Sequence, residues 1–237
     1  MKKYFIGASL ILGALGVLIP YTFLTIQFEY PDILREETGT ILSKFYQGGT
    51  PLIWNWWFFA ILGLPLIPAY ILLGKQLQEK IAAVRWATTI GVIGLIAQMV
   101  GLLRWTFVVP ILAKNYVEGN EATKEASKVG FQIIHQFGGV ILGEHIGQIF
   151  TIIWTIVISY ALTKMSIIPR WLGIMGHIAA IIYLGAQTEL FNTVVPSISV
   201  IGIAGFLGST LWIIWLILIG VYIIKHQKSD LQNSNEN

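Results

Sequence analysis

Long apolar runs separated by polar stretches form the dominant pattern of this chain. Six runs are long enough to cross the hydrocarbon core of a bilayer as helices, which takes about 20 mainly apolar residues. The expected spans cover residues 4–26, 51–74, 86–112, 139–163, 171–189 and 199–224. The pattern predicts an all-α integral membrane six-helix bundle, formed by one transmembrane domain over residues 1–224 and followed by a short polar tail over residues 225–237.

Two of the connections between spans are too long to be simple turns. Residues 27–50 carry apolar side chains at helical spacing, which predicts a helix at the membrane interface that ends at Gly48-Gly49. Pro51 suits the first position of the span that follows. Residues 114–128 are polar and are expected to lead as a helix into the fourth span.

The distribution of basic residues predicts the orientation of the chain. With both termini inside, nine Lys and Arg residues fall on the inner side and five fall in the two long connections on the outer side. The positive-inside rule therefore favours an N-in and C-in topology, with the interfacial helices on the outer face and the polar tail in the cytoplasm. The expected location is the cell membrane.

Composition agrees with this class of protein and excludes others. Hydrophobic residues make up 55% of the 237 positions and charged residues 11%, and the mean hydropathy is +0.72, as expected for a chain whose main solvent is lipid. The chain has no cysteine, so it has neither disulfides nor thiolate ligands. The net charge is only +3 and the basic residues form no run, so no nucleic-acid partner is predicted.

The fourth span carries two stripes that predict contact with other helices. At about 100° per residue, one face of an α-helix collects polar side chains. These are Glu144, Gln148, Thr151, Thr155 and Ser159. Beside them Gly139, Gly143 and Gly147 have the small-xxx-small spacing that admits a neighbouring backbone, either within the bundle or in a membrane partner or second copy of the chain.

Arg104 and Glu144 are the ionisable pair expected at membrane depth. In the predicted topology both lie a few residues below the outer ends of adjacent spans, so their depths match to within about one helical turn. Ionisable groups inside a membrane are expensive unless they are paired or hydrated. The sequence therefore predicts a contact between Arg104 and Glu144, which either belongs to a functional site or only locks two helices together.

The outer half of the bundle is the expected place for a pocket. Its predicted floor is Arg104, Glu144 and Gln148, and its predicted roof is the connection 27–50. An aromatic wall with a few fixed polar groups is typical of a site for a small molecule or a lipid headgroup. The remaining candidate ligand-binding residues are Trp54, Trp57, Trp105, His135 and His145.

Metal and cofactor chemistry is not predicted. The H-x-x-E-H pattern would need a histidine where the chain has Ile141, and no H-E-x-x-H occurs. His145 and His177 are expected in opposite leaflets, which does not suit a haem held between two helices. The sequence also contains no G-x-S-x-G motif for a serine nucleophile.

Three functional hypotheses remain open from the residues alone. The first is binding, sensing or passage of a small amphipathic or anionic molecule. The second is an intramembrane enzyme that uses Glu144 and His145 as acid and base on a lipid-like substrate. The third is an accessory membrane subunit in which the Arg104–Glu144 pair is purely structural.

Three phrases carry a resemblance to a known family. They are FEYPDILREETGTILSKFYQGG, GLLRWTFVVPILA and GVILGEHIGQ, which begin at Phe28, Gly101 and Gly139. Together with the six-span layout they resemble a bacterial multi-pass membrane family of unknown function, the DUF4386-like group. The resemblance covers nearly the whole chain and implies no activity, substrate or cofactor.

Overall fold

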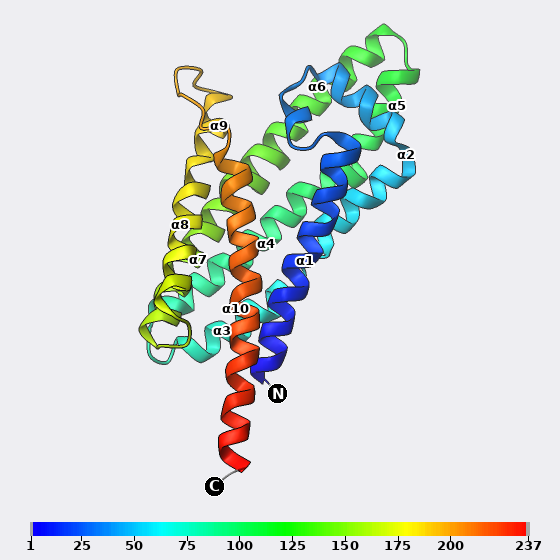
Figure 1. Cartoon of the computed structure of the whole chain (residues 1–237). Coiled ribbons are helices and arrows are strands. Elements are labelled where there is room, and N and C mark those ends of the chain that lie inside the picture. The colour runs from blue at the N-terminus through cyan, green and yellow to red at the C-terminus, as the bar shows by residue number, and fades with distance from the viewer. Residues whose placement is uncertain (1, 236–237) are drawn as a thin grey trace. The chain divides into compact units, whose positions relative to one another are not determined.

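The computed structural model describes residues 2–235, and its regular structure in that range is helical (Figure 1). The elements in chain order are α1 (Lys2–Phe28), η1 (Asp32–Arg35), α2 (Thr38–Ile61), α3 (Leu66–Leu77), α4 (Ala83–Phe107), α5 (Val109–Glu118), α6 (Glu121–Ile134), η2 (His135–Ile146), α7 (Gly147–Lys164), α8 (Arg170–Gly185), α9 (Gln187–Asn192) and α10 (Ala204–Asn235). Helix α10 continues through most of the predicted tail, and residues 236–237 lie outside the described residues.

Six helical stretches within the described range are long and apolar enough to cross a membrane. They run over Lys3–Phe28, Thr38–Leu77, Ala83–Glu118, Glu121–Lys164, Arg170–Asn192 and Ala204–Lys225. The prediction of an all-α, six-span membrane protein is thereby confirmed. Several stretches are longer than the predicted spans because the polar connections continue as helix.

Glycine and proline set the breaks inside these stretches. Gly49 has φ 54° and ψ −154°, a backbone conformation that glycine adopts readily, and it kinks α2 at the predicted end of the interfacial helix. Pro65 precedes α3, and Pro110 lies in the first turn of α5. Proline has no backbone N–H to donate, so it separates α2 from α3 and α4 from α5.

The chain forms two compact units. The first unit contains residues 2–15, 63–95 and 147–235, and the second contains residues 16–62 and 96–146. Helices α1 and α4 therefore contribute a part to each unit.

Close helix packing holds the first unit together. Helix α8, yellow in Figure 1, packs against both α7 and α10. A Cβ built on Gly176 of α8 would lie 2.6 Å from Nε1 of Trp215, and one on Gly91 of α4 would lie 2.5 Å from the Trp154 ring. Small residues thus admit the large rings of neighbouring helices, as is usual where lipid supplies no hydrophobic drive for association.

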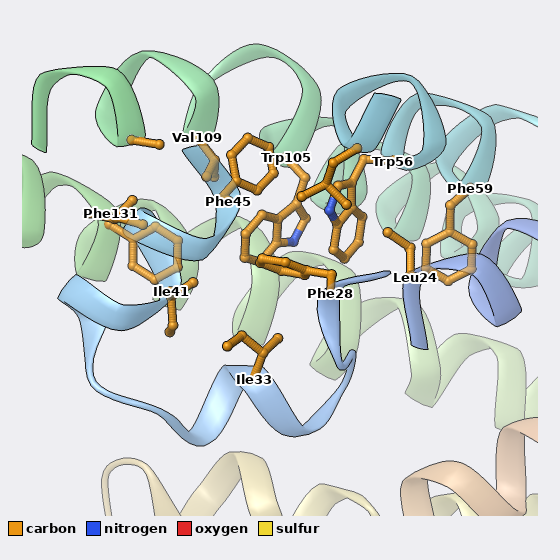
Figure 2. Packing of buried hydrophobic residues seen from close by; sticks show 13 residues of the cluster. Leu24, Phe28, Ile33, Ile41, Phe45, Trp56, Phe59, Trp105, Val109 and Phe131 are labelled. Carbon is orange, nitrogen blue, oxygen red and sulfur yellow. The ribbon is translucent and has the colours of Figure 1, made fainter. Parts of the chain in front are cut away.

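An aromatic cluster forms the core of the second unit (Figure 2). Trp105 stacks on Trp56 with ring centroids 4.6 Å apart and an interplanar angle of 10°. Phe28 meets the Trp105 ring edge-on at 5.5 Å, and Phe45 stacks on it at 5.7 Å. Ile33 of η1 is buried in the same cluster, so the connection 27–50 covers these rings.

We expect Trp56→Ala to destabilise the protein far more than Trp54→Ala. The Trp56 side chain is fully buried and its loss would leave a cavity, at a cost of about 3–5 kcal/mol. The Trp54 side chain is 54% exposed, and its loss should cost less than about 0.5 kcal/mol. Thermal unfolding in one detergent measures both variants, and equal losses would contradict this assignment of the core.

The predicted topology has both termini on the inner side of the membrane, because six crossings return the chain to its starting side and the basic residues favour the inside. The chain has no native cysteine, so single cysteines report cleanly on each side. In intact cells we expect an impermeant maleimide to label Ala122→Cys in α6 and to leave Ser229→Cys unlabelled until lysis. The reverse pattern would show an N-out topology.

Candidate functional site

Arg104 is the central residue of the candidate site in the second unit. It lies in the last turn of α4, where a cation complements the helix dipole, and it is only 7% exposed. Its Nη1 donates to the carbonyl of Gly101 at 2.5 Å, and its Nη2 lies 3.5 Å from Nδ1 of His135. A charged side chain is thus buried between α4 and η2.

Glycines of η2 make room for the guanidinium. A Cβ built on Gly139 would lie 2.5 Å from Nη2 of Arg104. A Cβ on Gly101 of α4 would lie 2.5 Å from the carbonyl oxygen of Gly138 and 2.8 Å from Cα of Gly143. The backbones of α4 and η2 therefore meet directly, and Gly139 and Gly143 face α4 of the same chain.

Residues 135–146 form a π-helix. In this conformation the backbone hydrogen bonds join residues i and i+5, so the turn is wider than in an α-helix. Side chains in this segment therefore do not follow the 100° spacing assumed from the sequence. The continuous polar face expected from Glu144 into α7 stays a prediction. Such π-helical turns are rare and occur frequently at functional sites.

The hydrogen bonds of Arg104 leave part of its guanidinium without an acceptor. Glu144 of η2 is near enough for its charge to act on the guanidinium. The hydrogen bonds described for the guanidinium go to Gly101 and His135, and the direct Arg104–Glu144 ion pair stays a prediction. Nε of Arg104 is buried and has no hydrogen-bond partner among the described residues.

His135 connects Arg104 to the aromatic cluster. Its ring stacks on Phe131 at 5.3 Å with an interplanar angle of 20°, and it lies edge-on to Trp105 at 6.3 Å. Of the predicted site residues, the structure therefore brings Arg104, Trp105 and His135 together. Glu144 and His145 are both partly buried in η2.

Other predicted site residues have contacts of their own, and their place in the pocket stays a prediction. Gln148 belongs to the first unit, where its Oε1 accepts from Nε2 of Gln187 at 2.8 Å. Trp54 is largely exposed and packs edge-on against Trp57 at 5.6 Å. Sequence reasoning did not select Trp56, the buried tryptophan that stacks on Trp105, because three nearby tryptophans are equivalent until the helix rotation is known.

The polar stripe of α7 faces the interior of the first unit. Thr151, Thr155 and Ser159 are buried, and Nε1 of Trp212 donates to the hydroxyl of Thr155 at 3.0 Å. These residues therefore serve helix packing. Within residues 3–225, the part of the chain whose side chains the structure describes, no group of three or more His, Asp or Glu side chains is arranged to hold a metal ion.

These features define the class of the molecule, a multi-pass helical membrane protein with a buried cation beside a π-helix. Residues 5–220 match the model of the family described as a domain of unknown function, DUF4386. The chain belongs to this family. Comparison with curated proteins and with solved structures found no match.

We expect Gly101→Ala to destabilise the protein by about 1–3 kcal/mol, because the new methyl group would press on the η2 backbone beside Arg104. Gly202→Ala is the control, since a Cβ there meets nothing within 4 Å. Thermal unfolding compares the two variants. If both unfold at the wild-type temperature, the direct contact between α4 and η2 is wrong.

Proposed function

We propose that this protein binds a small amphipathic anion in the membrane through Arg104, and that it acts as a receptor or carrier for that molecule in the cell membrane. One observation carries the proposal: the buried guanidinium has an Nε–H group without an acceptor among the described residues. A buried donor without a partner is costly, and the cost rises when the group is charged.

The acceptor that fits this group is a carboxylate or a phosphate. The two acceptors that the guanidinium already has, a backbone carbonyl and an imidazole nitrogen, carry no negative charge of their own. Two oxygens of an anionic headgroup can accept from Nε and Nη2 of Arg104 together, which is the arrangement in which arginine binds most strongly. Trp105 and Phe131 border the same region and suit the apolar part of such a ligand.

Entry of the ligand requires movement of a covering segment, because Arg104 is only 7% exposed. Helix η2 is the natural candidate. It covers the guanidinium with Gly138 and Gly139, which have no side chains, and its π-helical geometry is of a kind that occurs frequently at functional sites. The hypotheses of acid–base catalysis by Glu144 and His145 and of an accessory subunit stay predictions from the sequence.

The test is a thermal shift of the purified full chain with oleate or lysophosphatidate as probe and neutral monoolein as reference. A ligand at about 100 times its Kd stabilises the folded state by about 2.7 kcal/mol, which corresponds to a shift of several degrees. We expect the two anionic probes to raise the unfolding temperature of the wild type and of Arg85→Met, an exposed control in the first unit.

Substitutions at the site separate binding from a structural role. Arg104→Met should abolish the shift, and Arg104→Lys should weaken it because lysine lacks the planar fork. Glu144→Gln should keep or strengthen the response, since it removes a negative charge that competes with the ligand. An unchanged shift in Arg104→Met and Arg104→Lys would overturn the proposal, as would equal stabilisation by monoolein.

A further inference from the structure

A second site lies in the first unit, at the turn between α7 and α8. A cavity of about 540 Å³ opens there, lined on one side by residues of this turn and on the other by Tyr222 of α10. Two of the candidate membrane-spanning stretches meet beside it, since one ends at Lys164 and the next begins at Arg170. The cavity therefore lies at the level of the lipid headgroups.

The charged residues that line this cavity are all basic. Lys164 and Arg170 line it, and none of its lining residues is acidic. Nζ of Lys164 donates to the hydroxyl of Tyr160 at 3.0 Å and lies 5.3 Å from the centre of that ring. Neither basic side chain has a carboxylate partner among the side chains that the structure describes.

The backbone adds to the positive potential. Arg170 occupies the first position of α8, a helix of 16 residues whose first turn contains no acidic residue and whose N-cap, Pro169, provides no side-chain hydrogen bond. A cation at the positive end of a helix dipole is unfavourable unless an anion binds between them. The cavity, its two cations and the start of α8 thus all favour the same negative charge.

We propose that this cavity binds a phosphate-bearing anion, and that an anionic phospholipid of the surrounding leaflet is its source. The phosphate would lie between Lys164 and Arg170, within reach of the hydroxyl of Ser166. Ile168 and Pro169 provide an apolar wall for the glycerol and the start of the acyl chains. Basic pockets between transmembrane helices at the membrane surface are a known form of headgroup recognition.

The site is independent of the proposed Arg104 site. Its residues belong to the first unit, and those of the Arg104 site belong to the second. Substitutions at either site therefore test one proposal without touching the other.

The experiment is native mass spectrometry of the full chain in a neutral detergent, titrated with phosphatidylglycerol or phosphatidylcholine. Both lipids contain a phosphate diester, but choline adds a positive charge that Lys164 and Arg170 repel. We expect the wild type to prefer phosphatidylglycerol by about tenfold. The double variant Lys164→Gln with Arg170→Gln should lose about 30-fold in affinity for it, since each basic residue at a membrane surface contributes roughly a factor of five.

Two control variants test whether the loss of affinity is specific to the charges of the cavity. Arg85→Gln removes one exposed positive charge outside the cavity and should change the affinity by less than about threefold. The exchange Lys164→Arg with Arg170→Lys keeps both charges and should keep the binding. If the double glutamine variant does not fold, the single variants Lys164→Gln and Arg170→Gln replace it, each with a loss of about fivefold.

The outcomes distinguish the sources of the phosphate. If only other anionic lipids displace phosphatidylglycerol, the lipid headgroup is the source of the phosphate. Binding of inorganic phosphate without binding of phosphatidylglycerol would show that the lipid is not the source. No preference between the two lipids, or an equal loss of affinity in Arg85→Gln and in the single cavity variants, would overturn the site itself.

Discussion

A positive charge buried between two helices is the constraint around which the second unit is built. The Arg104 guanidinium is almost fully removed from solvent, and it requires hydrogen-bond acceptors and a counter-charge. The chain supplies a backbone carbonyl from the same helix, an imidazole from the start of η2, and a carboxylate within electrostatic range. Much of the local geometry follows from fitting this side chain between two helices.

That fit explains the glycines and the unusual helix around the site. Gly139 has no side chain where the guanidinium lies, and Gly101 allows the backbone of α4 to touch that of η2. The π-helical geometry of residues 135–146 gives this segment a wider turn than its α-helical neighbours α6 and α7. The aromatic cluster supports the arrangement from the other side, since the Trp105 ring next to Arg104 is held between Trp56, Phe28 and Phe45.

Features that depend on local composition could be predicted from the sequence. The six spans follow from the length of the apolar runs, and the kink at Gly49 and the breaks before Leu66 and Val109 follow from glycine and proline. The inward face of α7 also agrees with the α-helical spacing of Thr151, Thr155 and Ser159.

Features that depend on helix geometry and rotation could not be predicted. The sequence placed His135 in the same pocket as Arg104, but the contact between the two side chains depends on the π-helical period of residues 135–146, which the 100° spacing does not describe. The sequence gives no reason to choose among Trp54, Trp56 and Trp57, and only the packing of the helices shows that Trp56 is the buried one. The cavity at Lys164 and Arg170 depends on Tyr222 of α10, which is distant in the sequence from the α7–α8 turn.

An experimental map of the protein, purified in a mild detergent with its native lipids, would show directly whether Arg104 binds a ligand. We expect elongated density that is not protein, with its polar end within hydrogen-bonding distance of Nε of Arg104 and its apolar part beside Trp105 and Phe131. A well-resolved map would contradict it if the guanidinium bound only protein acceptors, such as the Glu144 carboxylate, and side chains filled the space around it.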